Sequence, residues 1–324
     1  MNDKYMEALA QYDMTTGSVR KGRSGWICET SMGVVLLKEY RGTQKRLEFE
    51  SQVLGQVNRE GLVQVDNYIL TKENGLVALG EDGTKYVLKR WFTDRECNLK
   101  DPDEILEAAR QIARLHKSFR QIPQKEDWNL GSIIIESLEK EMERHNQELK
   151  RARNYIRNKK KKTEFERCMI SCYSMFYEQA LEAYEGMKSL MEDGQSKLFL
   201  CHGNLDHHHV LLGDGYVSII EFNKMHLGMQ MTDLYHFMRK VMEKHEWDQA
   251  LGERMLSAYD RVLAMDEKDR DSLYYLFLYP EKYWKQVNFY YNARKTWIPA
   301  RNLEKIQTLE AQTDARKKFL AILR

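Results

Sequence analysis

The hydrophobic pattern of the chain changes near residue 100, and this change constrains the fold more than any other feature. Residues 15–95 contain short apolar runs separated by glycine turns, and the run GVVLLKEY is typical of a buried strand. An Asn-Gly and an Asp-Gly dipeptide separate three further apolar runs, and both favour tight hairpin turns. From Pro102 onward, apolar residues recur at helical spacing. The sequence therefore predicts a small β-rich region followed by a larger helical one.

Within this plan we predict an N-terminal β-rich lobe over residues 1–95, with one helix in the segment KRLEFESQVLGQV, and a helical C-terminal lobe over 96–324. Apolar spacing over about 134–190 predicts a long helical hairpin that turns at the basic stretch RNKKKKTE. This stretch is open to two interpretations, an anionic partner or a solvated helix end. The nearby glutamates balance its charge and favour the solvated end.

Composition narrows the classes of partner and compartment. The chain has 324 residues, enough for about two domains, and a formal net charge of +2, too small to require nucleic acid as a partner. No segment has the roughly 20 apolar residues of a membrane span, and the N-terminal segment MNDKYMEALAQYD lacks the apolar core of a signal peptide. Five cysteines, an odd number, indicate reduced thiols and a cytoplasmic protein.

The segment FLCHGNLDHHHVLLGDGYVSIIEFNKM, residues 199–225, has the organisation of a phosphotransferase catalytic centre. An apolar strand leads into His-Gly and a polar loop, and a second apolar strand ends at an acid. We expect LFLCHGN and GYVSIIEF to pair as strands, with tight turns at Gly213 and Gly215. Phosphoryl transfer also needs a lysine held by a helix glutamate. Lys38, at the end of GVVLLK, is the candidate, with Glu50 preferred to Glu48 as its partner.

These motifs resemble the His-Gly-Asp-(four residues)-Asn…Asp-Phe pattern of aminoglycoside and choline phosphotransferases. More narrowly, the chain resembles the CotS-type spore coat proteins of endospore-forming Firmicutes, through GVVLLKEY…KRLEFESQVL, YVLKRWFTDREC, LCHGN…HHHV, TDLYHFMRKVMEKHEW and YPEKYWKQVNFYYNARKTWIP. The resemblance covers nearly the whole chain. It implies an α+β, two-lobed, protein-kinase-like (aminoglycoside phosphotransferase-like) fold.

The resemblance also implies roles for residues of the central segment. His202 and Gly203 match the motif, whereas Asn204 stands at the position of the catalytic aspartate. His209 stands at the metal-binding asparagine and Glu221 at the metal-binding aspartate. The next two matches lie outside the segment: Asp233 with the acid that supports the loop, and Lys38 with Glu50 as the nucleotide-binding pair. The segment KRWFTDREC would be the hinge beside the adenine ring.

Three of these positions carry residues that change the chemistry. Asn204 cannot accept a proton, and general base catalysis contributes about 10²–10⁴-fold. Mg²⁺ prefers hard oxygen ligands, but His209 offers a nitrogen that suits Zn²⁺, Mn²⁺ or Ni²⁺ better, and Glu221 is one methylene longer than aspartate. Ordinary turnover of Mg-ATP is therefore not expected. A transition-metal site in the run DHHH is a rival interpretation, for which His209 with Glu221 is geometrically easier than three consecutive histidines.

The sequence therefore leads to a hypothesis and an alternative. The hypothesis is a spore coat protein with a kinase-like fold and impaired catalysis, a pseudokinase that assembles with other coat proteins and is deposited in the coat after cytoplasmic synthesis. The alternative is an active phosphotransferase of a small hydroxylated substrate, with ATP and a divalent cation as cofactors and unusual metal ligands.

Overall fold

The computed structural model describes residues 4–22, 24–125, 128, 133, 135–192, 198–292 and 300–324. The chain forms two compact units. Unit 1 comprises residues 1–134 and 199–227, and unit 2 comprises residues 135–198 and 228–324. Among the described residues, none of the helices combines the length and the apolar character needed to cross a membrane. The lobe boundary expected near residue 95 stays a prediction, and the two compact units do not follow it.

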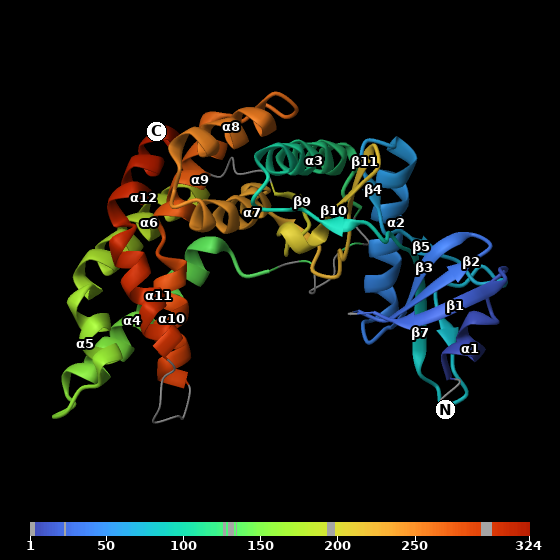
Figure 1. The fold of residues 1–324 in the computed structure, drawn as a ribbon, viewed down its shortest axis with the longest axis horizontal. Helices are drawn as coiled ribbons and strands as arrows, with labels where there is room; N and C mark the ends of the chain where they lie inside the picture. Colours follow the sequence, from blue (N-terminus) through green and yellow to red (C-terminus); the bar gives the residue numbers. More distant parts are fainter. Residues whose placement is uncertain are drawn as a thin grey trace. The chain divides into compact units, whose positions relative to one another are not determined.

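Unit 1 is built on an antiparallel sheet in the order β1-β2-β3-β7-β5, with β6 also paired to β7. Figure 1 shows this sheet in blue and teal, with α2 beside it. The elements are α1 (Lys4–Leu9), β1 (Thr16–Lys21), β2 (Trp26–Thr30), β3 (Gly33–Glu39), α2 (Gln44–Glu60), β5 (Tyr68–Ile69), β6 (Ala78–Leu79), β7 (Lys85–Arg90) and α3 (Pro102–Gln121). The strand-rich region with one long helix, predicted from the sequence, is confirmed.

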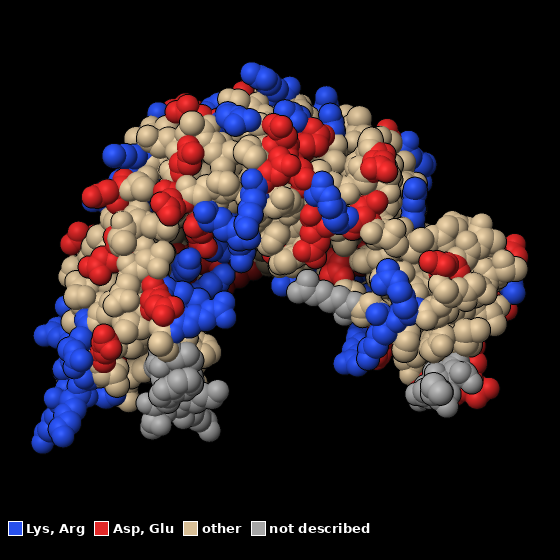
Figure 2. Space-filling view, in the orientation of Figure 1, with Lys and Arg blue, Asp and Glu red and all other residues tan. Residues whose placement is uncertain are grey.

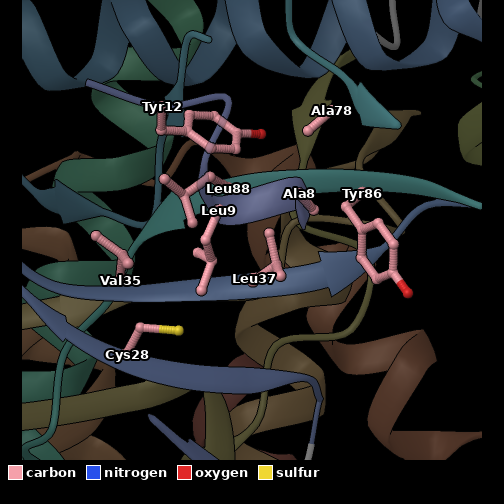
Figure 3. Close-up of a cluster of buried hydrophobic side chains, with 9 residues drawn as sticks. All are labelled: Ala8, Leu9, Tyr12, Cys28, Val35, Leu37, Ala78, Tyr86 and Leu88. Carbon is pink, nitrogen blue, oxygen red and sulfur yellow. The ribbon is translucent and has the colours of Figure 1, made fainter. Parts of the chain in front are cut away.

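The two faces of this sheet have different roles. One face carries a hydrophobic cluster that α1 covers (Figure 3), formed by Ala8, Leu9, Tyr12, Cys28, Val35, Leu37, Ala78, Tyr86 and Leu88. Because side chains alternate along a strand, the register of β3 with β7 places Leu36, Lys38, Val87 and Lys89 on the opposite face. Tyr68 pairs with Lys89 and shares that face. The hydrophobic cluster therefore fixes which side chains point to each face of the sheet.

Local signals set the ends of the two long helices of unit 1. The Thr43 side chain accepts a hydrogen bond from the Arg46 N–H at the start of α2, and Gly61 ends this helix with a φ of 69°. The Asp101 side chain caps α3, which has Pro102 in its first turn. These caps fix where α2 begins and ends and where α3 begins, through residues next to the helices in sequence.

Two smaller sheets complete unit 1. One has the order β4-β11-β10-β8, and the other pairs β12 with β9. The bounds are β4 (Gln64–Val65), β8 (Arg95–Glu96), β9 (Phe199–Cys201), β10 (Val210–Gly213), β11 (Tyr216–Ile219) and β12 (His226–Gly228). The expected pairing of LFLCHGN with GYVSIIEF is wrong. The turn at Asp214-Gly215 instead pairs β11 with its neighbour in sequence, β10, and leaves β9 to β12.

Unit 2 is helical throughout its described part. Its helices are α4 (Leu138–Arg157), α5 (Glu164–Ser171), α6 (Tyr173–Glu192), α7 (Met231–Lys244), α8 (Gln249–Asp260), α9 (Glu267–Leu278), α10 (Glu281–Asn292), α11 (Ala300–Ala311) and α12 (Thr313–Leu320). Helix α6 packs against α4 and α9, and α10 packs against α4. The basic turn between α4 and α5 forms a group of Lys and Arg side chains in Figure 2. Within it, Lys159 pairs at 2.5 Å with the buried Glu166, one of the nearby glutamates expected to balance its charge.

Candidate functional site

A pocket of about 520 Å³ opens within unit 1. The segment after β7, the loop after His202 and the β1–β2 hairpin contribute most of its wall. Its lining residues are Arg20, Ser24, Ile27, Trp91, Phe92, Thr93, Asp94, Glu96, Asn204, Asp206, His208, His209, Leu211, Ile220 and Glu221. Asn204, His209 and Glu221 were predicted as site residues from the sequence, and the structure brings all three to this pocket. Five residues of the predicted hinge segment KRWFTDREC also line it, Trp91, Phe92, Thr93, Asp94 and Glu96.

His202 lies beneath the pocket and holds the loop in place. Its side chain is fully buried. Its Nε2 is 3.0 Å from the Ile220 carbonyl oxygen, and its Nδ1 accepts from the Asn204 N–H at 3.2 Å. These two contacts require a neutral ring with the proton on Nε2. His202 therefore joins the loop to the residue that precedes Glu221, and acts as a positioning residue.

Asp206 organises the polar loop. Its Oδ1 accepts from the His208 N–H at 3.0 Å and lies 2.8 Å from His209 Nδ1. Burial opposes the charge of this carboxylate, but the hydrogen bond and the charge of His209 outweigh it and hold the pKa of Asp206 well below its usual range. The Asn204 amide nitrogen lies 3.3 Å from His209 Nε2. Both ring nitrogens of His209 are therefore engaged within the loop.

Glu221 has an unusual backbone conformation at the edge of the pocket. Its φ of 68° lies in the left-handed region, which a residue with a side chain adopts at a cost of about 1–2 kcal/mol. Its N–H donates to Asp66 Oδ2 at 3.0 Å, and its carboxylate accepts from the Ser24 hydroxyl in the turn between β1 and β2. The surrounding hydrogen bonds hold this conformation and direct the carboxylate toward that turn.

A buried ion pair supports Glu221 from behind, and sequence reasoning missed it. Lys89 Nζ lies 2.7 Å from the same Asp66 Oδ2, and both side chains are almost fully buried. The ammonium also lies 4.7 Å from the centre of the Tyr68 ring. Burial raises the pKa of Asp66, although Lys89 favours the charged carboxylate. The one signal in the sequence is that Lys89 stands inside the apolar run YVLKRWF.

The expected ion pair between Lys38 and Glu50 is not formed, which corrects the prediction that Lys38 is held by this glutamate. Glu50 Oε1 pairs with Arg46 Nε at 2.5 Å, one helical turn earlier, and its Oε2 accepts from the Tyr68 hydroxyl at 2.6 Å. Burial beside this carboxylate raises the pKa of Tyr68. Lys38 has no ion-pair partner among the described residues and does not line the pocket.

Asp233 belongs to unit 2 and is not among the pocket-lining residues. It occupies the first turn of α7 and is fully buried. Its N–H donates to the Gln230 carbonyl oxygen at 3.0 Å. Its role in supporting the loop stays a prediction.

The donors at the family's two metal positions do not suit a magnesium nucleotide. At the first position, the nitrogens of His209 are engaged by Asp206 and Asn204, and magnesium prefers oxygen ligands. At the second position, the Glu221 carboxylate accepts from Ser24. Among the described lining residues, the four carboxylates of Asp94, Glu96, Asp206 and Glu221 face one lysine or arginine side chain, Arg20. This lining repels a polyphosphate unless a cation accompanies it.

Comparisons with known proteins agree with this architecture. The profile described as the phosphotransferase enzyme family (APH) matches residues 19–275. The fold is similar to that of an aminoglycoside phosphotransferase from Alicyclobacillus acidocaldarius subsp. acidocaldarius DSM 446, with a TM-score of 0.83 and 17% identity over 98% of this chain and 94% of that one. No curated protein matches the chain.

Two further solved structures share the fold. A microcompartment-associated aminopropanol kinase has a TM-score of 0.63 and 13% identity, over 98% of this chain and 97% of that one. The amicoumacin kinase hAmiN, in complex with AMP-PNP, Ca²⁺ and Ami, has a TM-score of 0.58 and 13% identity, over 98% of this chain and 94% of that one. The aminoglycoside phosphotransferase-like fold predicted from the sequence is confirmed.

Proposed function

Since the chain belongs to the phosphotransferase enzyme family (APH), we propose that it is a catalytically impaired member of that family, a pseudokinase whose fold serves in assembly. The observation that carries this proposal is the state of the catalytic positions in unit 1. Asn204 replaces the general base, and His209 is engaged on both ring nitrogens. Glu50 pairs with Arg46 and leaves Lys38 without its carboxylate.

Each replacement removes a different part of phosphoryl transfer. An amide at position 204 can orient a hydroxyl group but cannot take its proton, a loss of about 10²–10⁴-fold. Without oxygen ligands at position 209, one of the two metal ions that neutralise the phosphates has no site. Without a carboxylate partner, Lys38 still carries a positive charge, but its ammonium group is not held in one position against the phosphates. Together these losses reduce phosphoryl transfer much more than any one of them.

The spore coat is the proposed place of assembly. The support is the resemblance to CotS-type coat proteins in motifs that extend from GVVLLKEY to the aromatic segment after Pro280. Part of that last segment, residues 293–299, lies outside the described residues. We propose cytoplasmic synthesis, deposition in the coat and other coat proteins as partners. A fluorescent fusion that stays in the mother-cell cytoplasm of a sporulating host would contradict this proposal.

The catalytic part of the proposal is tested by restoring the family's residues. We expect the natural chain to show no ATP turnover above a Lys38→Ala control with Mg²⁺ or Mn²⁺. The triple variant Asn204→Asp/His209→Asn/Glu221→Asp should gain turnover, or at least Mg²⁺-dependent nucleotide binding. Turnover by the natural chain that Lys38→Ala abolishes would refute impaired catalysis.

An active phosphotransferase is the second candidate, and the pocket itself favours it. Its volume of about 520 Å³ is within the range of sites for small ligands, and Trp91, Phe92 and Ile27 offer apolar surface for a ring. ATP and a divalent cation would be the cofactors, since solved relatives are complexed with ADP, AMP, or AMP-PNP with Ca²⁺.

Thermal-shift titration with ATP or ADP, each with no metal, Mg²⁺, Mn²⁺ or Zn²⁺, separates the two candidates. A ligand at 100 times its Kd adds about 2.7 kcal/mol of apparent stability. A metal-dependent shift that Lys38→Ala removes would favour the enzyme. The absence of any shift would favour a scaffold.

A further inference from the structure

The polar loop brings together a set of metal-ligand side chains that differs from the family's two metal positions. Asp206, His207 and His208 place one carboxylate oxygen and two imidazole nitrogens within 4.8 Å of one another. Consecutive histidines were expected to diverge. In the structure, residues His207–His209 form a 3₁₀ turn, and the rings of His207 and His208 lie 3.9 Å apart between centroids.

We propose that Asp206, His207 and His208 bind a transition-metal ion, with Zn²⁺ the best match to two imidazoles and one carboxylate. Zinc takes such ligands at about 2.0–2.2 Å and tolerates three protein ligands with water as the fourth. In a tetrahedral site with these bond lengths, two ligand atoms lie about 3.3–3.6 Å apart. The three side chains lie within 4.8 Å of one another, and rotation of the two partly exposed histidine side chains brings their donor atoms onto one ion.

The hydrogen bonds of the loop leave donor atoms of Asp206 and His208 available. Asp206 uses Oδ1 for the His208 N–H and for His209, and its other carboxylate oxygen has no partner within the described part of the chain. His208 Nδ1 lies 2.6 Å from Glu96 Oε2, which leaves Nε2 for the ion. A carboxylate behind a ligating imidazole fixes its tautomer and raises its basicity, and is typical of zinc sites.

The surroundings also favour a cation. Besides Asp206, the pocket lining contributes the carboxylates of Asp94, Glu96 and Glu221, with Arg20 as the one basic side chain among the lining residues. Carboxylates of one sign along a concave wall raise the local concentration of cations. The same lining that disfavours a polyphosphate therefore attracts a divalent ion.

Calorimetric titration of Zn²⁺ into the full chain, without nucleotide, tests the proposal. We expect one equivalent to bind, and His208→Ala or His207→Ala to weaken binding by about 100-fold or more. Glu96→Gln should weaken it by about 10-fold, as the loss of an outer-shell partner does. Asp214→Asn is the control, because it removes an exposed carboxylate in the turn between β10 and β11 that does not line the pocket, and it should leave the affinity within about 3-fold. Glu221→Gln removes a carboxylate of the same pocket at the family's metal position and should weaken binding less than either histidine variant.

A second readout reports the ligands directly. Co²⁺ bound at this site should give visible absorption bands that Zn²⁺ displaces and that His208→Ala abolishes. The proposal is overturned if no Zn²⁺ binds, or if binding is lost in Glu221→Gln but kept in both histidine variants. It is also overturned if several equivalents bind and no substitution affects them. Because the titration contains no nucleotide, its outcome does not depend on the proposed function.

Discussion

Replacement of Lys89 by methionine is the sharpest test of how the site is supported. The substitution leaves the Asp66 carboxylate buried beside apolar atoms, with the Glu221 N–H as its remaining partner. Removing one member of a buried ion pair costs about 3–5 kcal/mol. For a unit of this size the loss lowers Tm by on the order of 10 °C. The control Lys85→Met, at an exposed position of the same strand, should change stability by less than about 0.5 kcal/mol.

The pH dependence of the stability of the Lys89→Met variant shows whether the unpaired Asp66 carboxylate causes the loss. Without Lys89, the folded-state pKa of Asp66 lies above its unfolded value, so the folded variant binds a proton more readily than the unfolded chain. The penalty is fully present above the folded pKa and is lost as the pH falls toward about 4. Urea denaturation at pH 5, 6, 7 and 8, followed by circular dichroism, measures it. The double variant Lys89→Met/Asp66→Asn should recover at least half of the loss. A pH-independent loss, or no recovery, would refute the reasoning.

Three further predictions concern single positions. Gly203 has a φ of 83°, and a methyl group there would lie 2.2 Å from the Lys224 carbonyl oxygen, so Gly203→Ala should cost more than about 2 kcal/mol in urea denaturation. His202→Gln should cost about 1–3 kcal/mol, because one buried ring satisfies two backbone groups; an unchanged Tm would contradict this. In unit 2, burial opposes the charge of Glu281, but Arg239 and its neighbours lower its pKa from 4.5 to about 2. This stabilisation is present above pH 4.5 and should fall by about 3 kcal/mol as the pH drops to 2, but not in Glu281→Gln.

The fold class follows from the sequence because its signals are local. Glycine turns, strand-like apolar runs and helix caps such as Asp101 act over a few residues, and the structure contains them where the sequence places them. The loop from His202 to Glu221 was located for the same reason, because its residues are close in sequence. What the sequence could not show is pairing between distant segments.

Strand pairing and ion pairing illustrate this limit. The partner of β9 was predicted wrongly because β12 lies more than twenty residues away and the choice depends on the hairpin that forms between them. Lys38 on β3 and Lys89 on β7 point to the same face of the sheet. The position of Asp66 after β4 decides that Lys89, and not Lys38, forms the buried ion pair. Similarly, Arg46 reaches Glu50 from within α2, an i,i+4 contact that competes with any lysine from the sheet.

These pairings bear directly on nucleotide binding. A phosphate-contacting Lys38 needs Glu50 as its carboxylate, and Glu50 is held by Arg46 and Tyr68. If Glu50 left Arg46 to pair with Lys38, the buried guanidinium of Arg46 would lose its carboxylate, at a cost of about 3–5 kcal/mol. Such a cost corresponds to a loss of about a hundred-fold or more in affinity, since each 1.4 kcal/mol is a factor of ten. A divalent cation at Asp206 would displace no such ion pair, so the pairing of Glu50 with Arg46 does not oppose the proposed cation site.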